Sequence, residues 1–529
     1  MTGTWSLIRL VLRRDRVIMP LWVIFFAVVP LSYITTIEGL FPSAADKARY
    51  AATSANNAGF VALYGQLFGS SIGELVVWRA GFLPVMIGLA VILTVIRHTR
   101  ADEEAGRREL VGAGVVGRQA QLAAAMITTC VASLVMGLLL AAAMAGQGLP
   151  GAGSLAFGLQ MAASGWVFAA VAAVAAQLTA NSSTARGIAI TVLGAAYVLR
   201  AVGDISGVTS GPLAWLTVLS PIGWVQAIRP YGDDRLWLVL VVLVISAVLA
   251  AAAVALSARR DVGAGLLPPR PGPAEGALGT PLGLAWRLHR GLLAAWVGGF
   301  IALGVVMSYL AEGVGDLVGD NQAMRDAFAR LGGASGLIDS YLAGISGMFG
   351  LVAGAYGIQA MLRARVEETS GRVEPVLATA AGRLRWLGSH LFFSLLGPAV
   401  VLVVVGVSMG ITHGLNVRDV GGELPRLLAG TLVQLPAVWT LSAVAVLLFG
   451  VLPRFAAVAW AALAACVLVT LVGTAMGLDQ WVLDISPFTH LPKLPGGHVT
   501  AGPLIVLSAI ALVVVAAGLT GFRRRDVPS

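Results

Sequence analysis

Long apolar runs constrain this chain more than any other feature of its sequence. A helix needs about 20 mainly apolar residues to cross the hydrocarbon core of a bilayer, and it satisfies its own backbone hydrogen bonds there. Hydrophobic residues make up 58% of the 529 residues, whereas soluble domains contain about 45–50% apolar residues. The sequence therefore predicts an all-α polytopic membrane protein. Its twelve predicted spans are residues 17–37, 79–97, 119–145, 154–179, 187–203, 236–257, 291–311, 345–362, 388–412, 425–450, 455–476 and 503–521.

A charged segment that follows the second apolar run is repeated later in the chain. We name Arg97–Arg118 the first charged segment and Arg363–Arg383 the second charged segment. Eight charged or glycine positions match at an offset of 265 residues, in a chain with only 12% charged residues. Because chance is a poor explanation for this match, we infer an internal duplication. The matched positions are Arg100, Asp102, Glu103, Gly106, Arg107, Glu109, Gly117 and Arg118 in the first copy, and Arg365, Glu367, Glu368, Gly371, Arg372, Glu374, Gly382 and Arg383 in the second.

The duplication and the number of spans predict how the chain is organised. Residues 1–257 and 284–529 form two six-helix halves, and the Pro- and Gly-rich residues 258–283 form a cytoplasmic linker. Of the 35 Lys and Arg residues, 24 fall on the side that carries both termini. Since positive charge is concentrated on cytoplasmic loops, we expect both termini and both charged segments to be cytoplasmic.

The residue patterns needed for several kinds of chemistry are missing. A Walker A loop requires Lys directly after Gly, and neither Lys47 nor Lys493 follows a glycine. The six histidines form no HExxH pattern, and Cys130 and Cys466 have no metal-ligand spacing. The net charge is +9, but no basic run is interleaved with aromatic residues, as nucleic acid binding would require. We therefore expect no enzyme activity, no metal site, no cofactor and no nucleic acid partner for this chain.

The charged segments carry a motif that resembles a known family. Arg-x-(Asp/Glu)-Glu-x-x-Gly-Arg-x-Glu follows the second span of each half, and residues 5–16 form an amphipathic stretch. Ser-Pro occurs in a long outer segment before each sixth span, at Leu219–Trp224 and Ile485–His490. This combination resembles ABC-2-type exporter permeases, and the fused twelve-span form resembles the actinobacterial permeases of the tetronasin or polyketide-antibiotic exporter group. The resemblance covers the whole chain and implies two tandem six-helix ABC-2 (type V exporter-like) halves.

The resemblance also implies a partner and a function. In that family the segment between spans two and three is a coupling helix that docks on a separate ATPase subunit. The chain would then be the permease of a multi-pass exporter in the bacterial plasma membrane, extruding hydrophobic or amphipathic drugs. Two copies of an ABC ATPase would bind ATP and Mg²⁺ and power the transport. Carried over to this sequence, the docking residues are Arg100, Glu103, Glu104, Gly106, Arg107 and Glu109 in the first charged segment, and Arg365, Glu367, Glu368, Gly371, Arg372 and Glu374 in the second.

Other interpretations of the same residues stay open. The span count also fits an ion-coupled secondary multidrug carrier, although no predicted span carries the chain of Asp, Glu or His residues that such carriers commonly use. A lipid or polymer exporter permease fits the resemblance as well. The alternative for each charged segment is a solvated loop. Polar and aromatic residues on the fourth and tenth spans are candidates either for a substrate cavity or for helix packing, namely Gln160, Trp166, Gln177, Gln434 and Trp439.

Overall fold

The computed structural model describes residues 2–112, 114, 116–268, 279–318, 336–473 and 479–526. Parts of the predicted linker and of the predicted eleventh span lie outside these residues. By its internal contacts the chain divides into Met1–Gly272 and Pro273–Ser529, which we name unit 1 and unit 2. The division falls inside the predicted linker.

The described part of the chain is helical and contains no β-strand. Twelve helices or helix pairs in it are long and apolar enough to cross a membrane, and each overlaps one predicted span, so the predicted fold class is confirmed. In unit 1 they are α2 (Ile18–Leu40), α6 (Leu83–His98) continued by α7 (Arg100–Glu104), α9 (Ala120–Gly146), α10 (Gly151–Leu178), α11 (Ser182–Val208) and α14 (Trp237–Ala258). In unit 2 they are α15 (Pro281–Val318), α17 (Leu337–Thr369), α19 (Arg383–Asn416), α20 (Val420–Leu432) with α21 (Leu435–Val451), η2 (Pro453–Val458) with α22 (Ala459–Val467), and α25 (Ala501–Arg524).

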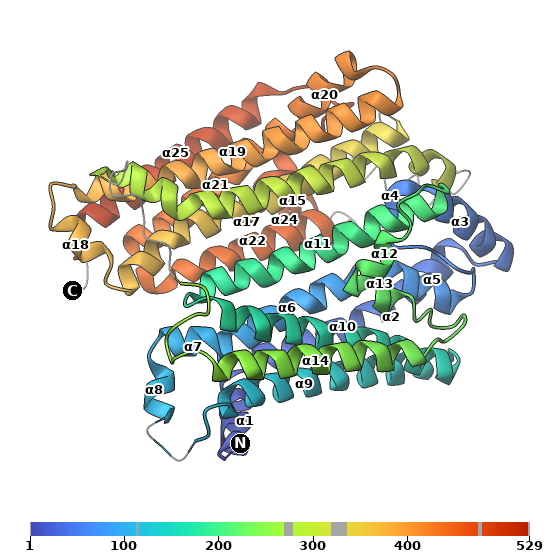
Figure 1. Cartoon of the computed structure of the whole chain (residues 1–529). Helices are drawn as coiled ribbons and strands as arrows, with labels where there is room; N and C mark the ends of the chain where they lie inside the picture. Colours follow the sequence, from blue (N-terminus) through green and yellow to red (C-terminus); the bar gives the residue numbers. More distant parts are fainter. Residues whose placement is uncertain are drawn as a thin grey trace. The chain divides into compact units, whose positions relative to one another are not determined.

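Small residues allow the spans of unit 1 to pack closely around α10 (Figure 1). In its most apolar stretch α10 is 78% buried, whereas α14 is only 22% buried, so α10 is the central span of this unit. A Cβ atom added to Gly137 of α9 would lie 2.3 Å from the carbonyl oxygen of Gly158 of α10. Such backbone contact is typical of helix packing in membranes, where small residues let helices approach.

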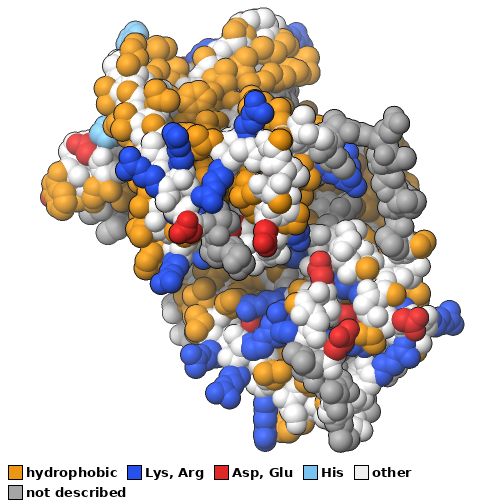
Figure 2. Space-filling view, turned by 90° about the vertical axis from the view of Figure 1, so that its left-hand side faces the viewer, with side chains coloured by type: hydrophobic (Ala, Val, Ile, Leu, Met, Phe, Trp, Pro, Cys, Tyr) orange, Lys and Arg blue, Asp and Glu red, His pale blue; other side chains and the backbone are white. Residues whose placement is uncertain are grey.

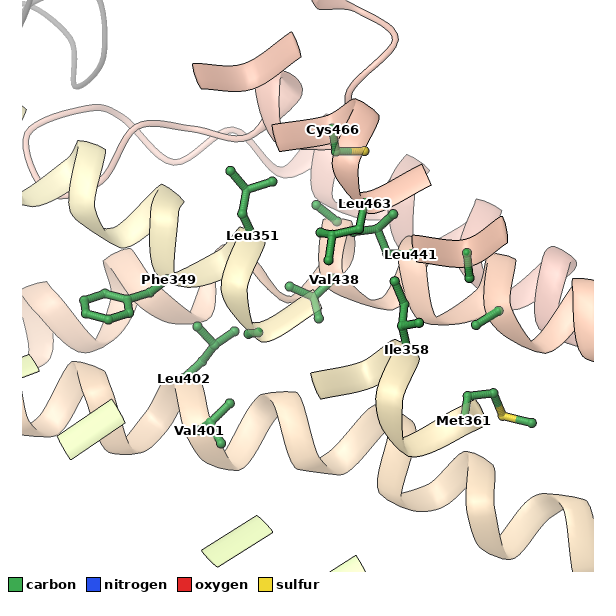
Figure 3. Close-up of a cluster of buried hydrophobic side chains, with 14 of the residues drawn as sticks. Phe349, Leu351, Ile358, Met361, Val401, Leu402, Val438, Leu441, Leu463 and Cys466 are labelled. Carbon is green, nitrogen blue, oxygen red and sulfur yellow. The ribbon is translucent and has the colours of Figure 1, made fainter. Parts of the chain in front are cut away.

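The core of unit 2 is a cluster of large apolar side chains on α17, α19, α21 and α22. Figure 3 shows Phe349, Ile358 and Met361 of α17 near Val401 and Leu402 of α19 and Val438 and Leu441 of α21. Val401, Leu402 and Val438 are fully buried. This packing fixes α17, whose last turn carries residues of the second charged segment.

One span of unit 2 is interrupted within its length. The tenth span divides into α20 and α21 at Val433–Gln434, and Pro436 is the second residue of α21. Proline lacks an N–H and cannot continue the hydrogen-bond ladder of a helix. The fourth span of unit 1, α10, is continuous over 28 residues, so the two units differ at this place.

Short helices occupy the two ends of each helix bundle. At the end of unit 1 that carries the first charged segment, α1 (Thr4–Arg14) precedes the first span. Short helices lie at the opposite end, and Figure 1 shows several of them: α3 (Ala44–Asn56), α4 (Ala58–Tyr64), α5 (Ile72–Arg79), α12 (Leu216–Leu219) and α13 (Pro221–Gln226) in unit 1, and α24 (Gln480–Leu483) and η4 (Pro487–His490) in unit 2. The hydroxyls of Ser220 and Ser486 accept hydrogen bonds from backbone N–H groups at the start of α13 and η4, which explains the Ser-Pro pairs in the sequence.

Candidate functional site

In each charged segment the helix of the second span ends, the chain turns at a glycine, and a short helix follows. In unit 1, α7 ends at Glu104 and α8 (Arg107–Gly112) follows. In unit 2, α17 ends at Thr369 and α18 (Val373–Leu377) follows. Gly106 and Gly371 both have φ of 70°, a left-handed conformation that glycine adopts at little cost. The duplicated glycines therefore make the same turn in both units.

A buried carboxylate fixes the first charged segment to the residues after the sixth span. The side chain of Glu103 is 2% exposed, and it accepts hydrogen bonds from both terminal nitrogens of Arg260, each at 2.8 Å. The backbone N–H of Gly263 and the guanidinium of Arg108 also donate to it, each at 2.8 Å. The buried guanidinium of Arg100 lies 3.2 Å from the same carboxylate. We name the Glu103–Arg260 pair the first clamp.

The second charged segment is held by an equivalent ion pair between a buried glutamate and an arginine after the sixth span of unit 2. Glu368, with a side chain 6% exposed, accepts hydrogen bonds from both terminal nitrogens of Arg525 at 2.6 and 2.7 Å. We name this pair the second clamp. Both clamps join residues that are 157 positions apart. In both units an arginine of the charged segment, Arg118 or Arg383, donates to the backbone carbonyl of the clamp arginine, 142 positions away.

The remaining acidic residues near each turn divide into internal and exposed groups. Asp102 and Glu367 are buried, and each pairs with an arginine five positions later. Glu104 accepts a hydrogen bond from the backbone N–H of Ser182 and so caps α11. The second copy has Thr369 at that position, and its hydroxyl bonds only within its own helix. Glu104 is exposed despite its contact with Ser182, and the other exposed carboxylates are Glu109 on α8 and Glu374 on α18.

The predicted docking residues thus occupy different environments. The side chains of Glu109 and Glu374 are exposed, and those of Arg107 and Arg372 are exposed while paired with Asp102 and Glu367. Glu103, Glu367 and Glu368 are buried and satisfied within their own units, and Arg100 is buried and donates to the carbonyls of Ala176 and Ala264. Arg365 is half-buried and donates to the carbonyl of Arg454. Glu104 is exposed but engaged with α11, and Gly106 and Gly371 form the turns.

Arginine dominates the surface near these segments. The face drawn in Figure 2 carries many more Lys and Arg side chains than Asp and Glu side chains. Arg14 of α1 donates to Asp102 at 2.6 and 3.1 Å, and this hydrogen bond raises the pKa of the guanidinium. Asp15 is buried and pairs with His98 at 2.6 Å. The amphipathic helix α1 is therefore attached to the first charged segment by ionic contacts.

Three of the five predicted cavity residues have structural contacts. The indole N–H of Trp166 donates to the carbonyl of Cys130, and that of Trp439 donates to the carbonyl of Leu395. These bonds join the third and fourth spans of each unit. Gln177 accepts a hydrogen bond from Arg260 at 2.9 Å, so it belongs to the surroundings of the first clamp.

The two other cavity candidates each line a pocket at the end of their unit opposite to the charged segment. Gln160 lies among Tyr64, Trp78 and Gln226 beside a cavity of about 170 Å³ in unit 1. Gln434 lies among Tyr341, Met348 and Phe488 beside a cavity of about 360 Å³ in unit 2. We name these the unit 1 pocket and the unit 2 pocket.

Sequence reasoning missed the arginines of the two clamps. Arg260 follows α14, and Arg525 follows α25. They are separated by the same 265 positions as the two charged segments. Applying the same offset beyond the charged segments would have aligned Arg260 with Arg525 and pointed to both residues.

Comparison with known proteins agrees with this description. A family profile described as "Multidrug efflux system permease Rv1217c, C-terminal domain" matches residues 278–523. The "Multidrug efflux system permease protein Rv1217c" of Mycobacterium tuberculosis is 46% identical to the chain over 530 residues, which cover 99% of this chain and 95% of that relative. The chain therefore belongs to the Rv1217c family of multidrug efflux system permeases.

Proposed function

We propose that the chain is the membrane subunit of an ATP-driven ABC exporter for hydrophobic or amphipathic compounds such as antibiotics and other drugs. Two copies of a separately encoded ATPase bind ATP and Mg²⁺, and each copy docks on one charged segment at the cytoplasmic side. The observation that carries this proposal is the duplicated clamp. Both units have a glycine turn, an ion pair between residues 157 positions apart, and an exposed short helix with an acidic residue, which we name the tip: α8 with Arg107 and Glu109 in unit 1, and α18 with the preceding Arg372 and Glu374 in unit 2. A solvated loop needs charged residues, but it does not need the same ion pair to a buried glutamate in both units.

The exposed tips, rather than the clamps, are the docking surfaces in this proposal. Glu109 and Arg107 on one tip, and Glu374 and Arg372 on the other, can reach a partner. Glu103 and Glu368 act as positioning residues because their carboxylates are fully used within their own units.

The clamps also give the tips a mechanical connection to the spans. Each clamp arginine follows the sixth span of its unit, and Glu104 additionally joins the first tip to the fifth span. When ATP binding draws the two ATPases together, a displaced tip moves the last span with it, because a bidentate pair to a buried carboxylate is costly to break. A drug bound more tightly in one arrangement of the spans than in the other is released by this change.

Charge reversal at the tips tests the proposal. The permease is co-expressed with each candidate ABC ATPase of the source genome, and drug-stimulated ATP hydrolysis is measured in proteoliposomes. We expect the double variant Glu109→Arg/Glu374→Arg to lose both co-purification and stimulation. The matched control Glu38→Arg/Asp479→Arg makes the same charge change at exposed sites away from the charged segments and should retain both.

Two results would contradict the proposal. One is normal stimulation of an ATPase by the tip variant. The other is drug transport that follows a proton gradient in vesicles without ATP, which would favour the ion-coupled carrier instead.

A further inference from the structure

The interruption of the tenth span places Gln434 beside the unit 2 pocket. Helix α20 ends at Leu432 and α21 begins at Leu435. Because Pro436 has no N–H, the carbonyl of Leu432 lacks the partner that a continuous helix would supply. Irregular backbone within a membrane is tolerated only where it is buried in protein or lines a cavity.

The side chain of Gln434 is buried without using its hydrogen-bonding groups. The residue is 5% exposed, and no hydrogen bond joins its carboxamide to a described residue. Its polar atoms are not among the fully buried unpaired atoms, so they stay accessible from the pocket that the residue lines. A carboxamide offers two N–H donors and one acceptor oxygen, and these groups are available to a ligand in the pocket. A Cβ atom added to Gly350 would lie 2.8 Å from Cβ and 2.9 Å from Oε1 of Gln434. Glycine at 350 therefore leaves the space that this side chain occupies.

The size of the unit 2 pocket fits a drug-like compound. Its volume is about 360 Å³, and small-molecule sites usually measure about 300–1,000 Å³. The unit 1 pocket beside Gln160 has only about 170 Å³. The two units therefore place a buried glutamine in a comparable position, but only the pocket of unit 2 reaches the volume of a ligand site.

The lining of the unit 2 pocket favours an uncharged ligand. Tyr341, Met348, Phe488 and Leu491 supply apolar and aromatic surface, and the described lining residues include no carboxylate. Among the described lining residues a desolvated cation would therefore find no counter-charge. Lys493 is also in the lining, and burial lowers the pKa of its ammonium.

We propose that the unit 2 pocket binds uncharged amphipathic compounds and that Gln434 forms their principal hydrogen bond. Met348 lies about 30 Å from Glu368 along α17, at 1.5 Å per residue, so the pocket is at the end of unit 2 opposite to the second charged segment. Its role as a site on the outward side of the exporter rests on the proposed function. Binding itself does not depend on that function.

Gly347 allows variants that add side-chain volume to the lining of the pocket. Gly347 lines the pocket, and a Cβ atom added there meets nothing within 4 Å. Gly347→Leu therefore occupies the ligand volume, and Gly347→Ala occupies less of it. Gly298→Leu is the matched control, because an added Cβ atom at Gly298 also meets nothing within 4 Å and the residue lies outside the pocket.

Equilibrium binding to the purified full-length chain, without any ATPase, tests the proposal. The probe is radiolabelled chloramphenicol, an uncharged amphipathic compound with amide and hydroxyl groups, measured by scintillation proximity. We expect saturable binding that ethidium, a cation, does not displace. Gln434→Leu should raise the Kd about tenfold, the loss expected for one buried hydrogen bond. Gly347→Leu should abolish saturable binding and Gly347→Ala should weaken it, whereas Gly298→Leu and Gln160→Leu should bind as the unmodified chain does.

Several outcomes would overturn this inference. They are the absence of saturable binding to the unmodified chain, native affinity in Gly347→Leu, and equal weakening by Gln160→Leu and Gln434→Leu. Since no ATPase is present, a failure of ATPase docking in the separate experiment on the tips leaves these results unaffected.

Discussion

The second clamp allows a direct test of whether a buried ion pair holds a charged segment in place. Arg525→Met leaves the Glu368 carboxylate buried and unpaired, which costs about 3–5 kcal/mol. Methionine is chosen because Arg525 also lies 4.9 Å from the rings of Phe449 and Phe522, and a thioether keeps a favourable contact with aromatic rings. The double variant Glu368→Gln/Arg525→Met leaves no unpaired charge and should cost about 1 kcal/mol.

Hydrogen exchange measured by mass spectrometry over residues 366–378 reports this difference locally. A loss of about 3 kcal/mol in the opening free energy lowers protection about 100-fold. We therefore expect the single variant Arg525→Met to lose at least that much protection and the double variant to lose about fivefold. Glu374→Gln changes an exposed carboxylate in the same segment and should leave protection unchanged. Equal losses in the single and double variants would refute the reasoning, because they would show that Glu368 and Arg525 are not coupled.

Three further perturbations follow from the same contacts. Gly371→Ala places a side chain at φ of 70° without a steric clash, so protection of the second charged segment should fall by about 1–2 kcal/mol. Gly137→Ala should sharply reduce the yield of monodisperse protein in size-exclusion chromatography, because its Cβ atom would lie 2.3 Å from the Gly158 carbonyl oxygen; Gly146→Ala, with nothing within 4 Å, should not. Arg14→Ala removes a partly exposed ion pair between α1 and α7, so exchange in α1 should accelerate about fivefold, as expected for about 1 kcal/mol.

The spans could be predicted because their length and composition are set by the bilayer. All twelve predicted runs overlap observed candidates, and the errors lie at the ends. The seventh predicted span began at residue 291, whereas α15 begins at Pro281. Residues 281–290 carry Arg287, His289 and Arg290 among apolar residues, and these charged and polar residues hide the continuation of the helix when only apolar runs are sought.

The position of the charged segments could be predicted, but the burial of their side chains could not. Charge in a short loop normally indicates exposure, and the repeat drew attention to Glu103 and Glu368 as surface residues. Their partners, Arg260 and Arg525, are 157 positions away. Only the folded units bring these distant residues together.

The roles of the cavity candidates also could not be predicted from the sequence. Trp166 and Gln434 are both polar or aromatic residues within apolar spans, and sequence could not separate packing from pocket lining. The structure separates them because the indole N–H of Trp166 has a backbone acceptor, whereas the carboxamide of Gln434 faces a cavity. The permease role predicted from the resemblance agrees with the family to which the chain belongs.

The sidedness of the two exposed tips tests the central claim most directly. Single cysteines are introduced as Glu109→Cys or Glu374→Cys in a chain that also carries Cys130→Ala and Cys466→Ala, and a membrane-impermeant maleimide is applied. The account predicts that neither tip is labelled in intact cells and that both are labelled in inside-out vesicles. Labelling of the two tips from opposite sides, or of either tip from outside the cell, would contradict it.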